Sequence, residues 1–207
     1  MPPPEPAPAS DLRRRRRTRT KLSVQTEALR LFAAKGYQQT SVDEIAHAAA
    51  ISPRTFFRYF PCKEDVVLWD EYDELTPHEL WHTSLGGDPF AQLIRRVRDV
   101  TAEAYRSDPQ RLLARARLSF TVPDIRARFV DRQLSMIGPY FAELGDALGV
   151  RRDDLSLAMT FAAVYAAFLV ALERWQRHDG REDLLALVDD ALAALADSAS
   201  RLPPRVG

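Results

Sequence analysis

The stretch TSVDEIAHAAAISPRTFFRYF, residues 40–60, contains the start signals of two short helices. Ser41 with Glu44 three residues later forms a capping box. Ser52 followed by Pro53 is a second N-cap, with proline at the first helical position, where its missing N–H costs nothing. A three-residue break, AAI, separates the two helices. The pair is typical of a helix-turn-helix, a motif that binds DNA. The apolar residues that would close it are Ile45, Ile51, Phe56 and Phe60.

Helical patterning continues on both sides of this pair. Upstream, Gly36 ends a stretch with apolar residues at helical spacing, at Val24, Ala28, Leu31 and Phe32. Downstream no strand pattern is found. The sequence therefore predicts an all-α chain of about nine to ten helices, with an N-terminal three-helix helix-turn-helix domain and a larger helical domain. The later helices are expected at 62–75, just after Thr76-Pro77, and at 89–107, 109–120, 123–148, 153–178 and 182–200.

The second short helix of the pair has the composition of a DNA-reading element. Arg54 and Arg58 are one turn apart, on the side opposite the apolar Phe56 and Phe60. An exposed arginine near the start of such a helix can donate two hydrogen bonds to O6 and N7 of guanine. We therefore expect this helix to read bases in the major groove.

Other polar residues of the pair are suited to the DNA backbone. Thr55, Tyr59 and Lys63 can contact phosphates, which fixes register without reading sequence. Thr40 and Ser41 begin the first helix of the pair, where free N–H groups and the helix dipole favour a phosphate.

The charge distribution supports a chain with two roles. The net charge is zero, but residues 1–64 hold 12 Lys/Arg against 6 Asp/Glu, and residues 65–207 hold 17 against 23. Such asymmetry suggests a nucleic-acid-facing part joined to a part with another task. Cys62 is the only cysteine, so no intrachain disulfide can form and a reducing cytoplasm is the expected compartment.

No membrane association is expected. The start of the chain lacks the apolar core of a signal peptide. The uncharged run Leu155–Leu172 has 18 residues, at the lower edge for a membrane span, but it contains six alanines and is flanked by charges. We interpret this run as a buried bundle or interface helix.

The N-terminus is expected to be a disordered arm over residues 1–19. Residues 1–10 are rich in proline, and residues 13–19 read RRRRRTR. The arginine run is either a solvated tail or an arm that contacts DNA phosphates or a minor groove.

The segment from Thr20 to Val67 resembles the DNA-binding domain of the tetracycline-repressor (TetR) family of bacterial regulators. The resemblance is carried by ALRLFAAKGYQQTSVDEIAHAAAISPRTFFRYFPCKEDVV, which has the family's framework residues in the correct order and spacing. It covers about a quarter of the chain. We expect a DNA-binding domain over residues 20–66 and a helical ligand-binding and dimerisation domain over residues 67–207.

The resemblance implies a sequence-specific regulator, most often a repressor, that a small apolar effector releases from operator DNA. It implies no enzyme activity, no cofactor and no metal. The family's backbone-anchoring position falls on Thr40 and Ser41. The positions that typically touch DNA fall on Ser52, Pro53, Arg54, Thr55, Phe57, Tyr59 and Lys63, to which the helix pattern adds Arg58.

The chain departs from the family pattern at three positions. Phe57 replaces the usual tyrosine, which keeps an apolar contact but loses a phosphate hydrogen bond. Ala50 stands where the turn usually has glycine, and costs about 1 kcal/mol if that site needs a positive φ. Cys62 replaces a serine N-cap. It is either a tolerated small residue or, at a helix start beside Lys63, a thiol with a lowered pKa that can be oxidised.

The C-terminal part is expected to hold the effector pocket and the dimer interface. Aromatic residues are numerous there, and the candidate ligand contacts are Trp81, His82, Arg117, Phe120 and Tyr165. Alanines one turn apart in 158–171 form ridges of small residues. The last helix has an apolar stripe, Leu184, Val188, Ala191 and Leu195. We expect these two helices to form half of a four-helix homodimer interface, with packing inside one chain as the alternative.

Two other functions are weighed against a DNA-binding regulator. Residues 78–82, HELWH, match the zinc-protease motif H-E-x-x-H, but the extended motif fails because Leu85 occupies its glycine position. A non-specific DNA-architectural protein would use the arginine arm without a ligand, with weak sequence preference.

Overall fold

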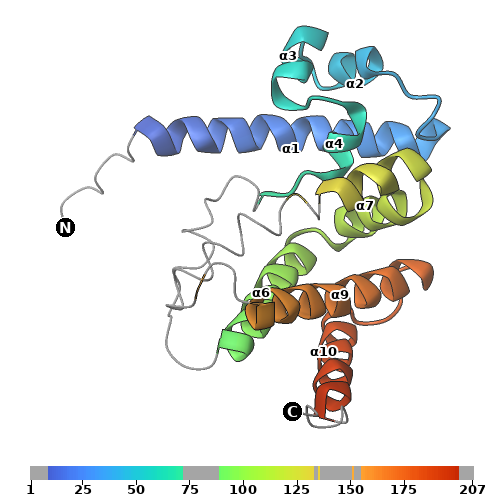
Figure 1. Cartoon of the computed structure of the whole chain (residues 1–207). Coiled ribbons are helices and arrows are strands. Elements are labelled where there is room, and N and C mark those ends of the chain that lie inside the picture. The colour runs from blue at the N-terminus through green and yellow to red at the C-terminus, as the bar shows by residue number, and fades with distance from the viewer. Residues whose placement is uncertain (1–8, 72–88, 133–134, 136–150, 152–154, 201–207) are drawn as a thin grey trace, which may run out of the picture.

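The computed structural model describes residues 9–71, 89–132, 135, 151 and 155–200. Within these residues the regular structure is helical and contains no strand, so the predicted all-α fold is confirmed (Figure 1). A further helical segment covers residues 123–132. The labelled helices are α1 (Ala9–Lys35), α2 (Val42–Ala48), α3 (Pro53–Tyr59), α4 (Lys63–Leu68), α6 (Pro89–Ser107), α7 (Pro109–Thr121), α9 (Leu155–Arg177) and α10 (Leu184–Ser200).

The helix-turn-helix forms as its capping signals predict. The Ser41 hydroxyl accepts the Glu44 N–H, and the Glu44 carboxylate accepts the Ser41 N–H, which completes the capping box of α2. The Ser52 hydroxyl accepts the Thr55 N–H at 3.1 Å, and Pro53 occupies the first turn of α3. These local hydrogen bonds set where each helix begins.

The turn between α2 and α3 is a Schellman motif with alanine at its left-handed position. The Ile51 N–H donates to the Ala46 carbonyl and the Ala50 N–H to the His47 carbonyl. Ala50 has a φ of +54°, so the condition under which alanine is costly at this position is met. Because a left-handed Cβ approaches the following carbonyl oxygen, this alanine costs about 1–2 kcal/mol relative to a right-handed conformation.

Helix α1 includes the arginine run. Residues 9–19, which we expected in a disordered arm, form its first turns, so that expectation is wrong for these residues. The physical reason is that Ala9–Lys35 contains no proline or glycine and arginine is a good helix former.

The core of the N-terminal helices includes residues from the C-terminal part. Val67 and Trp69, which follow the boundary expected at residue 66, are buried with the apolar residues of α1 to α3. Ile125, from the segment 123–132, is fully buried in the same cluster, and Leu118 of α7 packs against it. Helices α1 and α4 of the DNA-binding part therefore pack against α7 (Figure 1).

Helices α6, α7, α9 and α10 share a second core. Leu184 and Val188 of α10 are fully buried in it, and Ala191 and Leu195 pack against it. The apolar stripe that we expected at a dimer interface therefore packs inside its own chain, because α10 lies across α9.

The exposed apolar face belongs to α9 instead. Leu155, Met159 and Val170 are 75%, 61% and 62% exposed, and Ala162 and Ala166 lie exposed between them. At 100° per residue these five positions form one stripe along the helix. The Ala158–Arg177 stretch is also long and apolar enough to cross a membrane by length and composition, but it packs against α6, α7 and α10 as a bundle helix does.

We predict that Ala50→Gly stabilises the protein. Glycine removes the left-handed strain of about 1–2 kcal/mol but gives the unfolded chain more freedom, worth about 0.4–1 kcal/mol. The net gain in free energy of unfolding is about 0.5–1 kcal/mol, measurable by chemical denaturation. The matched control is Ala49→Gly, at a φ of −82°, which should destabilise by about 0.5–1 kcal/mol. Equal effects of the two substitutions would contradict the assignment of strain to Ala50.

Candidate nucleic-acid interface

The outer face of α3 carries two arginines with a phenylalanine between them. Arg54, Phe57 and Arg58 are exposed, and Phe57 is 53% exposed. Behind them, Phe56 and Phe60 are buried at 0% and 1% exposure. Because the buried pair fixes the rotation of α3, the three exposed side chains must face outward together.

The two arginines of this face differ in their surroundings. The Arg58 guanidinium lies 5.2 Å from the centre of the Tyr59 ring, a cation–π contact that limits its freedom. For Arg54 no hydrogen bond or ion pair is found among the residues that the structure describes. No acidic residue occurs between Glu44 and Glu64, so the surface of α3 is cationic.

Ser52, Pro53 and Thr55 lie at the N-terminal end of α3. Ser52 and Pro53 are exposed and Thr55 is half-buried. The Ser52 and Thr55 hydroxyls are 2.9 Å apart and hydrogen-bond each other. Both hydroxyls therefore already take part in hydrogen bonds at the start of α3. This leaves each of them less capacity to bond a DNA phosphate.

Thr40 and Ser41, at the start of α2, are placed differently from each other. Thr40 is 2% exposed and its hydroxyl donates to the Gly36 carbonyl at 2.9 Å, so this side chain closes the α1–α2 turn. Ser41 is exposed at the N-terminus of α2. The acidic Glu44 beside it is paired with Lys35, and that pairing together with the Ser41 hydrogen bonds lowers the pKa of Glu44 to about 2.

The contacts of Lys63 are within the N-terminal helices. Its ammonium donates to the Tyr37 and Thr40 carbonyls at 3.0 Å each and lies 4.0 Å from the centre of the Tyr37 ring. The Tyr37 hydroxyl donates to the Glu64 carboxylate, and burial together with that hydrogen bond raises the pKa of Tyr37. Lys63 therefore ties the α1–α2 turn to the start of α4, which positions α2.

Cys62 is the N-cap residue of α4, and its side chain makes no capping hydrogen bond to the helix. Burial and a hydrogen bond to Glu64 raise the pKa of its thiol to about 12. The lowering of this pKa that a helix start beside Lys63 could cause is not found, because desolvation and the neighbouring carboxylates raise the pKa instead. At neutral pH the reactive thiolate is therefore scarce.

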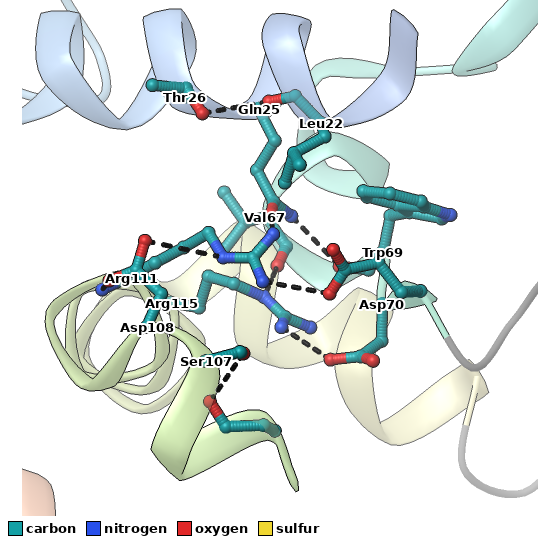
Figure 2. Close-up of polar contacts among 12 residues, drawn as sticks. Leu22, Gln25, Thr26, Val67, Trp69, Asp70, Ser107, Asp108, Arg111 and Arg115 are labelled. Atoms are coloured by element: carbon teal, nitrogen blue, oxygen red, sulfur yellow. Dashed lines mark hydrogen bonds and ion pairs between the residues drawn. The ribbon is translucent and has the colours of Figure 1, made fainter. Parts of the chain in front are cut away.

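The end of α4 is held by side chains from two other helices (Figure 2). Gln25 of α1 is fully buried, and its amide donates to the Val66 carbonyl at 2.7 Å and to the Trp69 carbonyl at 2.9 Å. Arg115 of α7 donates to the Val67 carbonyl at 2.9 Å and to the Leu68 carbonyl at 3.4 Å. Carbonyls that a helix end leaves without partners are thus satisfied from outside the helix.

Two ion pairs complete this junction. Arg115 pairs with Asp70 at 2.6 Å and Arg111 with Glu71 at 2.8 Å. The two arginine side chains are only 13% and 11% exposed, so these pairs are less screened than surface ones. Arg111 also reaches the Gln25 side-chain oxygen at 3.5 Å. The junction joins α1, α4 and α7 in one polar network.

The predicted effector contacts fall in different places. Arg117 is 46% exposed and pairs with Asp179 at 2.7 Å, on the surface. Phe120 is half-buried and packs against the second core. Tyr165 is also half-buried, and its ring is stacked parallel to that of Phe161, which packs against the same core. Trp81 and His82 lie outside the described residues, and so does the whole HELWH motif.

Comparison with known proteins decides the family. The model for bacterial regulatory proteins of the tetR family matches residues 26–68, and the model for the MftR C-terminal domain matches residues 88–200. The chain is 34% identical over 172 residues to the HTH-type transcriptional regulator TcmR of Streptomyces glaucescens, over 78% of this chain and 74% of that relative. This chain belongs to the TetR family. It is a DNA-binding transcriptional regulator with a helix-turn-helix domain.

Solved TetR-family structures share the fold. Thermus thermophilus FadR, a repressor in complex with lauroyl-CoA, superposes with a TM-score of 0.56 at 28% identity, over 90% of this chain and 99% of that chain. FadR from Bacillus subtilis, in complex with stearoyl-CoA, superposes with a TM-score of 0.52 over 84% of this chain and 96% of that chain. At 17% identity that second likeness shows the fold alone.

Sequence reasoning missed the junction that supports this TetR-family interface. Gln25 is a polar residue within the apolar pattern of α1, and Arg111 and Arg115 are one turn apart on α7. A glutamine at a position that the helical pattern assigns to the core is a signal that the sequence does contain. A polar side chain there needs a hydrogen-bond partner. Its partners are 41 and 44 residues away, and no local pattern identifies them.

Proposed function

We propose that this TetR-family regulator is a repressor that binds a near-palindromic operator through α3 and leaves it when a small apolar effector binds. The observation that carries the proposal is the exposed face of Arg54, Phe57 and Arg58, held outward by buried Phe56 and Phe60. We expect the protein to act in the cytoplasm, where operator DNA is.

The chemistry of this face supports base reading by Arg54. Its guanidinium can donate to O6 and N7 of a guanine, a contact that discriminates by about 1–3 kcal/mol. Phe57 can contact a thymine methyl. Arg58, held beside the Tyr59 ring, is placed for a neighbouring base or phosphate. Ser41 and the first turn of α2 would anchor the backbone, with Ser52, Pro53, Thr55 and Tyr59 as flanking contacts.

The two candidate anchors that face inward receive a different role. The polar groups of Thr40 and Lys63 already form hydrogen bonds within the chain. We therefore propose that these residues do not contact DNA themselves but fix the start of α2, which does. We therefore propose that the strongest phosphate contact near α2 is to its backbone N–H groups and Ser41.

Effector release would be a population shift between two positions of the DNA-binding helices. The end of α4 is bonded to α7, and α7 packs against α6 and α9. An effector that moves α7 would therefore move α4 and the α3 face with it. The half-buried aromatics Phe120 and Tyr165 support an apolar effector, with Trp81 and His82 as further candidates.

We propose that the homodimer forms through α9 and α10, with the exposed stripe of α9 at its centre. A stripe of Leu155, Met159 and Val170 with alanines between them is what a close helix–helix contact needs, because small residues let helices approach. Dimerisation would place two α3 helices on successive major grooves, about 34–36 Å apart.

We predict that Arg54→Ala weakens binding to the operator by about 1–3 kcal/mol, roughly 5- to 150-fold, and relaxes specificity at one base pair. The operator is first identified by selecting bound duplexes from DNA upstream of the protein's own gene, and affinity is measured by fluorescence anisotropy. Arg181→Ala removes one exposed arginine far from α3 and is the matched control. Equal affinities for Arg54→Ala and wild type would sink the assigned role of Arg54.

The same anisotropy assay tests the effector class. Lauroyl-CoA, the ligand in the Thermus FadR structure, should dissociate the complex at micromolar concentration, whereas coenzyme A alone should not. Release by both compounds, or by neither, would argue against an acyl chain as the effector and leave operator binding itself untouched.

We predict that Val170→Glu separates the dimer and weakens operator binding, because it places a charge in the centre of the proposed interface. The molar mass measured by light scattering should be that of a monomer instead of a dimer. Val130→Glu, at a residue 51% exposed on another helix, is the matched control and should leave the dimer intact. A dimer that survives Val170→Glu would mean that α9 does not form the interface.

A further inference from the structure

Helix α1 extends well beyond the core that it helps to form (Figure 1). Among residues 12–20 none is buried, and the first buried side chain from residue 12 onward is Lys21, which lies over the Phe60 and Trp69 rings. From Ala9 the projecting part is about 12 residues, or about 18 Å at 1.5 Å per residue.

The projecting part has no apolar face with which to pack on the rest of the chain. Leu12 is the only large apolar residue in 12–20 and is 58% exposed. Arginines occupy positions 13–17 and 19, and at 100° per residue they surround the whole helix. Five of these six arginines are exposed and Arg14 is half-buried.

Local energetics alone would not favour this arrangement. Six arginines in seven residues repel one another. This repulsion falls when an anionic polymer lies beside the helix, because phosphates then neutralise the arginines.

We propose that the arginine helix, residues 12–20, is a second DNA-binding element that contacts backbone phosphates outside the base pairs read by α3. The inference rests on the proposed operator binding. It commits to duplex DNA because α1 is one continuous helix, and its other end packs against α2 and α4. The arginines are therefore held at a fixed position relative to α3, as a contact of defined register requires.

This element differs from a flexible basic tail in two measurable ways. Its contribution should depend on duplex beyond the α3 site, because a rigid helix cannot fold back onto the same base pairs. It should also depend on the continuity of α1, whereas a tail needs only its charge. Each phosphate that the arginines neutralise contributes about −0.9 to the slope of log K against log salt concentration.

The test compares operator affinity and salt slope for wild type and a variant with Arg13 to Arg17 all replaced by glutamine. Glutamine keeps the helix propensity and removes the charge. We expect the slope to become shallower by roughly two to four per protomer, on a duplex with long flanks only. On a duplex trimmed to the α3 site the two proteins should bind alike.

Two further variants complete the test. Thr18→Pro keeps every arginine and interrupts α1 ahead of Lys21, so it should lose most of the flank-dependent affinity while circular dichroism and melting show an intact core. Arg106→Gln with Arg181→Gln removes exposed charge elsewhere and should leave the slope unchanged.

Three outcomes would overturn the proposal. An unchanged slope in the glutamine variant would mean that these arginines do not contact DNA. A slope that changes equally on trimmed and long duplexes, or a Thr18→Pro variant that binds like wild type, would indicate a flexible tail. Failure of the proposed function looks different, because wild type itself would then show no preferred operator.

Discussion

The carbonyl groups at the end of α4 join the DNA-binding helices to α7. A six-residue helix leaves most of its terminal carbonyls without internal partners. Here Gln25 supplies two donors and Arg115 two more, and the two residues come from α1 and α7. Because a buried carbonyl without a donor is unfavourable, the DNA-binding helices and α7 are held in one relative position. The junction therefore lies between the DNA-binding helices and the helices that we propose bind the effector.

Local signals in the sequence predicted the helix-turn-helix well, and the reason is physical. Ser41 and Ser52 start their helices through hydrogen bonds to residues three positions away, so the information is in adjacent residues. The buried pair Phe56 and Phe60 fixes which face of α3 is exposed. The positive φ at Ala50 was raised only as a condition, on the ground that the TetR family usually has glycine at this position.

Features set by distant contacts were not predictable in the same way. The apolar stripe of α10 would have the same sequence pattern whether it packed on α9 of its own chain or on a second chain. In the structure it packs on its own chain. The raised pKa of Cys62 was not predictable, because its burial and its contact with Glu64 arise only in the folded structure. The helical arginine run was missed because charge was taken as evidence of disorder, although arginine favours helix.

We propose that the end of α4 transmits the position of α7 to the exposed face of α3. Operator affinity of Arg115→Met tests this coupling, measured where circular dichroism shows the protein folded. Arg115→Lys serves as a control that keeps the charge. Arg115→Met should bind the operator about tenfold more weakly, in the range of known coupling energies, with an unchanged salt slope because no phosphate contact is lost. A folded Arg115→Met protein with wild-type operator affinity would contradict the claim.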